Sequence, residues 1–186
     1  MVTHARAAAT ESASQPAAAD MRTLAALWQA LGTVVDPEIP IVSIVELGIV
    51  RDVVRERDEW IVTVTPTYSG CPATRVIETD IREATTVAAG EEVRIVTALA
   101  PAWTTDWIAP EARHKLRDAG IAPPHGVVNN AAQSQPVMLH RRRDAVRCPR
   151  CGSLQTTELA RFGSTPCKAQ FRCTECLEPF DYFKPH

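Results

Sequence analysis

The 186-residue sequence has few aromatic residues and no long hydrophobic run. Aromatic side chains make up 5% of the residues and hydrophobic residues as a whole 45%, so the sequence predicts a modest, mainly aliphatic core. No apolar stretch approaches the roughly 20 residues that a membrane-spanning helix needs. The first 20 residues also lack the apolar segment of a signal peptide. We therefore expect a cytoplasmic protein without a membrane span, and a disordered tail over residues 1–20.

A strong excess of charge of one sign is absent too, since the formal net charge is −2. A chain this close to neutral does not attract nucleic acid as a whole. The charges are unevenly placed, however. Residues 140–186 hold nine Lys and Arg against five Asp and Glu, whereas residues 1–139 hold eleven against seventeen. The C-terminal part is therefore basic and the rest of the chain is acidic.

Two sets of catalytic motifs are missing. The sequence has no Gly-rich fingerprint for a flavin or nicotinamide cofactor. It also lacks the paired Glu-x-x-His motifs with which di-iron helical bundles hold their metals. We therefore expect no oxygen-activating or hydride-transferring site.

Cysteine is absent before Cys71, and five of the six cysteines lie between Cys148 and Cys176. Four of these form two C-x-x-C pairs, which is the spacing of metal ligands rather than of a secreted disulfide framework. Four thiolates at about 2.3 Å from a tetrahedral ion make a closed structural site. The sequence therefore predicts a zinc ribbon over residues 146–186, with strands within residues 154–162, 169–173 and 178–184. Spacing alone also allows iron. The expected ligands are Cys148, Cys151, Cys173 and Cys176.

Cys167 is left over from the two pairs. It could serve as an alternate ligand or as a redox partner. A small buried or incidental cysteine is at least as good an interpretation.

The acidic part of the chain predicts an α+β domain over residues 21–120. Leu24, Leu27, Trp28 and Leu31 recur at helical spacing after a cap at Asp20. Two β-branched runs joined by a polar turn predict a hairpin, and a helix and a third strand follow. The order α-β-β-α-β favours helices on one side of a small sheet. The expected ranges are a helix ending between residues 32 and 36, strands at 49–56 and 59–66, a helix over 71–90 and a strand at 92–99.

A helical extension and a linker separate this domain from the ribbon. Thr105 or Asp106 should cap a turn, and Pro110 suits the first position of a helix that ends at Gly120. Trp103 and Trp107 should pack the extension back onto the sheet. Residues 121–145 have the composition of an extended linker. We expect a short strand at residues 137–139 and a solvated basic run at residues 141–143.

Cys71 stands between the second strand and the second helix. Pro72 suits a first helical turn, so the sequence places Cys71 at or next to the N-cap. Free backbone N–H groups and the helix dipole favour a thiolate there. A thiolate can act as a nucleophile or as a soft metal ligand.

Asp36 and Glu38 flank Pro37 at the end of the first helix. Two carboxylates on a stiff turn could be hard metal ligands, a base, or only caps and surface charges. Taken alone, caps are the better interpretation. A functional role for the two carboxylates becomes more plausible when Cys71 is considered with them. All three residues lie at junctions between elements, and an α+β layer can bring such junctions together.

Residues 32–99 resemble the small domain family of iron–sulfur cluster assembly. The motifs that carry the resemblance are DPEIP, ELGIV, TPTYSGCPAT and IETDI. The remaining motifs, PAWTTDWIAPEARHKLRDAGIAPP, FGSTPCK and EPFDYFKPH, are similar to one subgroup, the D subunits of the bacterial phenylacetyl-CoA epoxidase system. The resemblance covers about residues 21–186. It implies a role in phenylacetate catabolism, with Cys71 as the functional thiol and Asp36 and Glu38 as its acidic partners.

This resemblance implies an accessory protein that holds iron or a nascent cluster on Cys71 and delivers it. The expected partners are the di-iron oxygenase subunit or the iron–sulfur reductase of the epoxidase complex. A cluster on one thiol would need a homo-oligomer or outside thiols. The alternatives are a thiol enzyme with Cys71 as nucleophile, which normally recruits a histidine, and a basic ribbon that binds nucleic acid.

Overall fold

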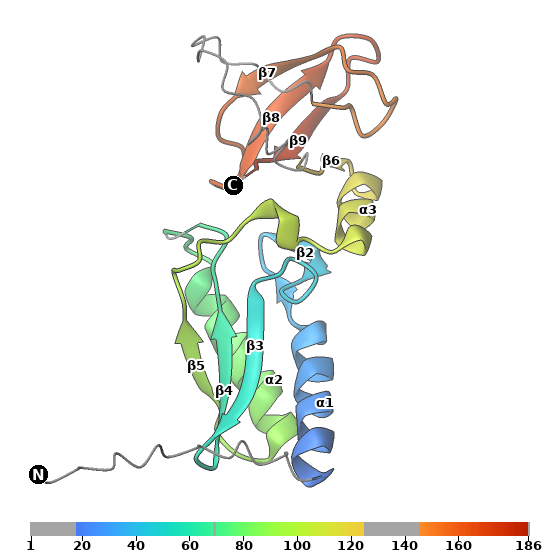
Figure 1. The fold of residues 1–186 in the computed structure, drawn as a ribbon. Helices are drawn as coiled ribbons and strands as arrows, with labels where there is room; N and C mark the ends of the chain where they lie inside the picture. The colour runs from blue at the N-terminus through green and yellow to red at the C-terminus, as the bar shows by residue number, and fades with distance from the viewer. Residues whose placement is uncertain (1–17, 69, 125–145, 186) are drawn as a thin grey trace, which may run out of the picture.

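The computed structural model describes residues 18–68, 70–124 and 146–185 of the chain. Within these ranges, helices and a sheet form a body, and a smaller ribbon of strands lies at one end of it (Figure 1). The predicted α+β class with a C-terminal ribbon is confirmed. The elements are α1 (Ala18–Thr33), β1 (Val35–Asp36), β2 (Ile39–Ser43), β3 (Val50–Glu56), β4 (Glu59–Val64), α2 (Thr74–Ala89), β5 (Arg94–Thr97), η1 (Thr105–Trp107), α3 (Pro110–Asp118), β6 (Ile121–Ala122), β7 (Thr156–Ala160), β8 (Lys168–Cys173) and β9 (Pro179–Phe183).

The first helix, α1, buries Leu27 and Leu31 completely. These residues lie four apart and therefore share one helical face. The helix ends at Thr33, within the predicted range, but it begins before Asp20. The prediction that Asp20 caps the helix was therefore wrong. Its carboxylate lies in the first turn, where it pairs with the Arg55 guanidinium at 2.8 Å.

The central sheet has the strand order β3-β4-β5. Strands β3 and β4 form the predicted hairpin, and its two turn residues, Arg57 and Asp58, have φ values of 47° and 71°. Positive φ at both central residues is the geometry that matches the twist of a two-residue hairpin. Strand β5 pairs parallel with β4, and α2 makes the connection between them. The predicted order α-β-β-α-β is confirmed for the two long helices and the central sheet.

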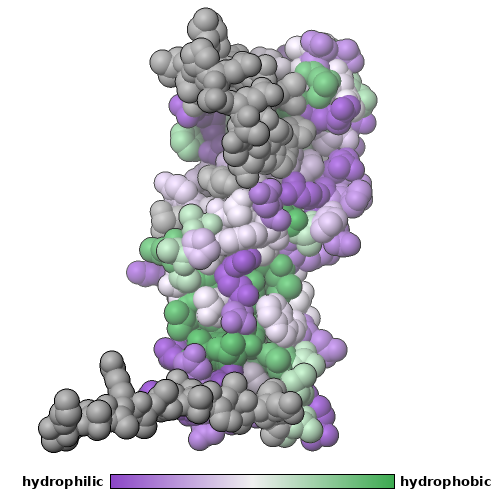
Figure 2. All heavy atoms as spheres, in the orientation of Figure 1, coloured by the Kyte–Doolittle hydropathy of each residue, from purple (hydrophilic) through white to green (hydrophobic). Residues whose placement is uncertain are grey.

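Both long helices pack on one face of this sheet (Figure 1). Trp60 and Val62 of β4 point into the resulting core, and α2 contributes Ile77 and Ile81. Ile61 is only 5% exposed but belongs to neither core cluster, because it lies on the opposite face of the sheet. Figure 2 shows hydrophobic side chains over this lower part of the molecule, interrupted by hydrophilic ones.

A second, smaller hairpin stands between α1 and β3. Its strands, β1 and β2, are joined by a turn at Pro37 and Glu38. The sequence predicted the turn but neither strand. Strands of two and five residues leave little periodicity to detect. This hairpin fixes the positions of Asp36 and Glu38 at one edge of the body.

The helical extension follows β5 and returns to the body. The α3 helix begins at Pro110, as predicted, and the turn before it is capped by Thr104 rather than by Thr105 or Asp106. Trp103 is buried and donates an indole N–H bond of 2.9 Å to the Leu47 carbonyl. A Cβ at Gly48, which has a φ of +69°, would lie 2.6 Å from the Trp107 carbonyl oxygen. Only glycine therefore lets the two segments approach this closely.

The ribbon is a four-stranded sheet with the order β6-β9-β8-β7. The three strands predicted from its sequence are present as β7, β8 and β9. The fourth, β6, comes from the expected linker and pairs parallel with β9. The first residues after α3 are thus part of the ribbon sheet. The disordered tail predicted over residues 1–20 was wrong for residues 18–20, which belong to α1. Residues 1–17, the strand expected at 137–139 and the basic run at 141–143 lie outside the described residues.

The ribbon packs onto the body through residues that join the main core. Phe183 of β9 is 1% exposed and Cys167 is 8% exposed, and both belong to the core cluster of the body. The Phe183 ring lies 6.1 Å from the Trp103 ring, centroid to centroid. Burial of a whole aromatic side chain in this way stabilises the contact by a few kcal/mol. The two parts therefore share hydrophobic packing.

We expect Phe183→Ala to lower the free energy of unfolding of the chain by about 3 kcal/mol, because it leaves a cavity between ribbon and body. Denaturant unfolding followed by tryptophan fluorescence measures this loss. Phe162→Ala is the matched control, since Phe162 is 66% exposed and its truncation should change stability by no more than about 0.5 kcal/mol. Equal effects of the two substitutions would contradict the packing described here.

Candidate functional site

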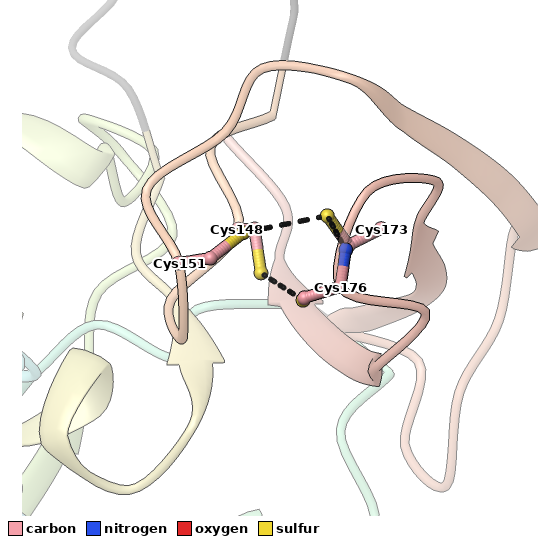
Figure 3. Close-up of side chains that lie close together, drawn as sticks. All are labelled: Cys148, Cys151, Cys173 and Cys176. Atoms are coloured by element: carbon pink, nitrogen blue, oxygen red, sulfur yellow. Dashed lines mark hydrogen bonds between the residues drawn. The ribbon is translucent and has the colours of Figure 1, made fainter.

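The four cysteines of the C-x-x-C pairs come together at the tip of the ribbon (Figure 3). Their Sγ atoms all lie within 4.8 Å of one another. Cys148 Sγ is 3.7 Å from Cys176 Sγ, and Cys151 Sγ is 3.5 Å from Cys173 Sγ. Two of the residues are buried and two are exposed. Within the described residues this is the only group of three or more side chains of metal-binding type at such spacing, and it could hold a metal ion.

Tight turns bring the two pairs into this position. The Gly152 N–H donates to the Cys148 carbonyl at 3.0 Å, and a φ of +77° at Gly152 lets that turn close. In the second turn, the Cys176 N–H points at the Cys173 sulfur from 3.5 Å. Backbone N–H groups directed at sulfur stabilise thiolates. Each C-x-x-C pair is therefore a compact unit with both sulfurs on the same side.

The four cysteines cannot all be ionised side by side without strong repulsion between the thiolates, unless a cation is present. The Cys176 N–H lowers the pKa of Cys173 to about 7. For Cys176, the Glu178 N–H favours the thiolate, but desolvation and the neighbouring thiols outweigh it and raise the pKa to about 12. A divalent ion removes this conflict because it attracts all four thiolates at once. The donor set therefore fits a soft or borderline metal ion.

Cys71 lies two residues before the cap of α2. The helix begins at Thr74, and its N-cap is Ala73. The prediction that Cys71 is the N-cap or its direct neighbour was therefore wrong, because Pro72 lies between Cys71 and the cap. Pro72 correspondingly precedes the cap instead of occupying the first turn. The Cys71 carbonyl accepts bonds from the Thr74 N–H at 3.2 Å and from the Thr74 hydroxyl at 2.9 Å. These bonds hold the half-buried thiol at the mouth of the helix.

The Cys71 thiol is not the ready thiolate that the sequence predicted. Burial is the largest influence and raises its pKa, and the carboxylates of Glu38 and Asp36 raise it further. The N–H groups of Ala73 and Thr74 act in the predicted direction, but they are outweighed. Cys71 is therefore protonated at neutral pH, and a bound cation would have to displace its proton.

Asp36 lines the same small cavity as Cys71, and the charges of Asp36 and Glu38 both act on the Cys71 thiol. Asp36 is 8% exposed, and its Oδ1 accepts the N–H bonds of Glu38 at 2.8 Å and of Ile39 at 3.0 Å. It therefore also has the capping role that the sequence left open. Asp36, Cys71 and Thr67 line one cavity of about 20 Å³, which is space for one water-sized group.

Burial raises the pKa of both carboxyl groups above their ordinary values. For Glu38 the charge of Asp36 adds to this effect, whereas Lys168 opposes it in both cases. A raised pKa means that the ionised form is less favourable in the folded chain than in the unfolded chain. The ionised carboxylate of Asp36, which is almost fully buried, therefore weakens the fold at neutral pH.

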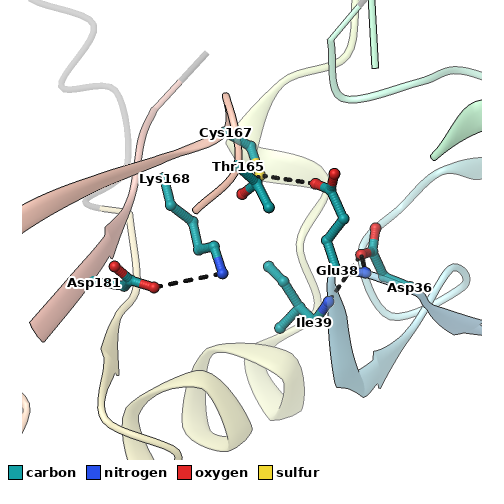
Figure 4. A network of polar contacts seen from close by, with 7 residues as sticks. All are labelled: Asp36, Glu38, Ile39, Thr165, Cys167, Lys168 and Asp181. Carbon is teal, nitrogen blue, oxygen red and sulfur yellow. Dashed lines mark hydrogen bonds and ion pairs between the residues drawn. The ribbon is translucent and has the colours of Figure 1, made fainter. Parts of the chain in front are cut away.

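Cys167, a residue of the ribbon, lies beside the carboxylate of Glu38 (Figure 4). The role of this cysteine could not be decided from the sequence. The Cys167 Sγ lies 3.8 Å from Glu38 Oε2 and 3.1 Å from the Thr165 hydroxyl. Lys168 is 5% exposed and pairs with Asp181 at 3.4 Å. Sequence reasoning missed Thr165 and Lys168, because no local pattern relates them to a turn about 130 residues earlier.

Histidine does not take part in the site within the ranges the structure describes. The single histidine there, His114, is exposed on α3 and lies 3.4 Å from the Arg117 guanidinium. Glu111 and His114 form one Glu-x-x-His sequence, but both side chains face solvent on a nine-residue helix. Across the described residues, none of the helices combines the length and the hydrophobicity needed to cross a bilayer.

Two family models match the chain, one in the body and one in the ribbon. The first is described as an iron–sulfur cluster assembly protein and matches residues 24–98. The second is described as a PaaD zinc beta ribbon domain and matches residues 132–184. The first range includes Asp36, Glu38 and Cys71, and the second includes the remaining five cysteines.

Relatives of known name match the same parts. The chain is 48% identical over 158 residues to an Escherichia coli K12 protein named as the D subunit of a "Putative 1,2-phenylacetyl-CoA epoxidase", covering 85% of this chain and 90% of that protein. It is 36% identical over 88 residues to a Porphyromonas gingivalis protein named "Fe-S protein maturation auxiliary factor", covering 46% of this chain and 83% of that one. A crystal structure of the DUF59 domain of unknown function from Bacillus anthracis is 28% identical, with a TM-score of 0.47, and covers 50% of this chain and 91% of its own.

We expect Cys148→Ser to release the metal ion and unfold the ribbon, because three thiolates cannot replace the closed set of four. Metal analysis and amide hydrogen exchange of β7–β9 measure the two effects. Cys71→Ser is the control that removes a thiol from the body and should retain the ribbon ion. A metal-free variant with full exchange protection in the ribbon would contradict a structural role for the ion.

We expect Asp36→Asn to raise the free energy of unfolding at pH 7 by on the order of 1 kcal/mol. The amide oxygen can accept the same two N–H bonds without a buried charge. In wild type the buried charge of Asp36 lowers the free energy of unfolding. Because folding raises the Asp36 pKa, this loss is complete at a pH above the pKa in the folded chain and disappears as the pH falls below the pKa in the unfolded chain. The gain should therefore shrink towards pH 4, as chemical denaturation at several pH values would show. A gain that grows on acidification is the opposite result.

Proposed function

Because the chain belongs to the family of phenylacetyl-CoA epoxidase D subunits, we propose that it is an accessory protein of that oxygenase system. Its role is to help mature the iron-containing centres of the complex in phenylacetate degradation. The names of the relatives support both halves of this proposal, since one is called an epoxidase subunit and the other a maturation factor for iron–sulfur proteins.

The observation that carries the proposal is the position of Cys71 beside Asp36 in one small cavity, with Glu38 close by. A thiol and carboxylates together offer the donors that iron accepts in proteins. The thiol is half-buried, so it is shielded from bulk solvent but still accessible. We therefore assign Cys71, Asp36 and Glu38 to a site that holds an iron ion or a nascent cluster transiently.

Weak, exchangeable binding follows from the protonation of the site. The Cys71 thiol and both carboxyl groups have raised pKa values, so an incoming cation competes with protons for its ligands. Such a site holds its ion less firmly than a closed tetrad of thiolates. That difference suits a carrier, which must release what it binds.

The ribbon has the complementary role. We propose that Cys148, Cys151, Cys173 and Cys176 hold zinc, the metal that closed four-cysteine sites of this spacing most often bind. All six cysteines are free thiols, which is compatible with a cytoplasmic, reducing compartment. The clients in this proposal are the di-iron oxygenase subunit or the iron–sulfur reductase of the epoxidase complex.

The two alternatives from the sequence have less support. A cysteine nucleophile needs a lowered pKa or a neighbouring base, whereas the pKa of Cys71 is raised and the one described histidine lies on α3. For nucleic-acid binding, the basic run at residues 141–143 lies outside the described residues, and the ribbon aromatics Phe171, Phe180 and Tyr182 pack against one another.

We expect Cys71→Ser to leave the fold intact but to abolish maturation, because a serine hydroxyl does not hold a soft ion. The measurement is phenylacetyl-CoA epoxidase activity in cells that carry only the variant, together with the iron content of the purified oxygenase. Val76→Ala is the matched control, since Val76 lies near the same end of α2 and is 48% exposed. Full activity of the Cys71 variant would refute the proposed role of the thiol.

A further inference from the structure

The ribbon contributes a second thiol to the carboxylates that flank Cys71. Cys167 comes from the turn before β8, and its sulfur lies 3.8 Å from Glu38 Oε2 (Figure 4). Asp36 lines the cavity of Cys71, and its Oδ1 accepts the Glu38 N–H at 2.8 Å. One acidic turn of the body is thus shared by a thiol from the body and a thiol from the ribbon.

The position of Cys167 is fixed by several contacts. The Lys184 N–H donates to its carbonyl at 2.9 Å, and the Lys168 N–H closes the turn by donating to the Thr165 carbonyl at 3.1 Å. The Gly163 N–H donates to the Lys168 carbonyl at 2.8 Å. Cys167 is therefore held at the seam between ribbon and body by the backbone of the ribbon itself.

Cys167 packs against the hydrophobic core of the body, but a purely structural role does not explain all of its contacts. A buried structural cysteine behaves as a small hydrophobic residue and favours apolar neighbours. Here the thiol faces a carboxylate and a hydroxyl, and a buried lysine follows it in the chain. A cation between the thiols and the carboxylates would use these polar neighbours as ligands.

We propose that Cys71 and Cys167, together with a carboxylate of Asp36 or Glu38, form a binding site for a thiophilic divalent cation between body and ribbon. This inference rests on the proposed function, in which the cation is Fe²⁺ on its way to a client. Each thiol gives up one proton to solvent when the ion binds. A single chain then supplies two thiolates, so a mononuclear ion needs no second chain and no outside thiol.

Lys168 completes the charge arrangement of this site. Two thiolates and two carboxylates around a divalent ion carry a net charge of −2. The buried Lys168 ammonium acts on both carboxylates, and its pairing with Asp181 keeps it on the ribbon side. Within the described residues, the tetrad is the only group of three or more ligand atoms that all lie within 4.8 Å of one another, so the ligands of the second site must draw closer together to bind an ion. An open site of this kind releases its ion more readily than the tetrad.

Anaerobic titration of the full chain with Co²⁺, after the tetrad has been filled with Zn²⁺, tests the inference. The thiolate-to-cobalt charge-transfer band grows with the number of thiolate ligands. Wild type should bind one Co²⁺ beyond the tetrad. Cys71→Ser and Cys167→Ser should each halve the band, and the double variant should abolish it. Ser164→Ala changes an exposed residue of the same turn and should leave the band unchanged.

The variants separate this inference from the proposed function. If Cys167→Ser keeps the full band while Cys71→Ser abolishes it, Cys167 is no ligand and the inference fails, but a carrier site on Cys71 stands. If Cys71→Ser keeps the full band, the proposed function fails. If the double variant keeps the full band with loss of one Zn²⁺ per chain, cobalt has entered the tetrad and the inference also fails.

Discussion

The contact between ribbon and body determines where the reactive groups of this protein lie. Phe183 at the end of β9 enters the core beside Trp103, and the adjacent Lys184 N–H holds the carbonyl of Cys167. The strands that carry these residues belong to a sheet whose far end is tied by four cysteines. A small sheet of this size needs such a metal tie for stability. The tetrad therefore acts on the carboxylate site indirectly, because it maintains the strands that place Cys167 there.

The acidic turn of the body has a cost for stability. Asp36 is almost fully buried, Glu38 is partly buried, and both titrate above their ordinary pKa values. Packing alone would favour neutral groups at these positions. A carboxylate whose pKa is shifted by burial is a candidate for a chemical task. The thiols near these carboxylates supply donors for a cation, and cation binding is the task proposed for them.

Local patterns in the sequence predicted most of the architecture. Hydrophobic periodicity indicated α1 and α2, alternating β-branched residues indicated β3 and β4, and the C-x-x-C pairs indicated the ribbon. The errors concern features that tertiary packing decides. The start of α1 before Asp20 and the cap of α2 at Ala73 depend on one or two residues at helix ends, where sequence patterns are least informative. The raised pKa of Cys71 depends first on its burial in the folded chain and then on carboxylates that are about 35 residues away in the sequence.

The role of Cys167 could not be decided from the sequence for a similar reason. Its contact with Glu38 joins residues separated by 129 positions, and no periodicity or spacing encodes such a pair. The pairing of β6 with β9 was missed because two residues within an apparent linker carry no strand pattern. Both features arise when the ribbon folds back onto the body.

Anaerobic reconstitution with iron and sulfide tests the central claim, that the thiol site of the body binds iron separately from the ribbon tetrad. Iron and zinc per chain, measured together with the absorption spectrum, distinguish the two sites. We predict that wild type gains labile iron while keeping its ribbon ion, and that Cys71→Ser keeps the ribbon ion but gains less labile iron than wild type. Equal labile iron in the two proteins would contradict the account.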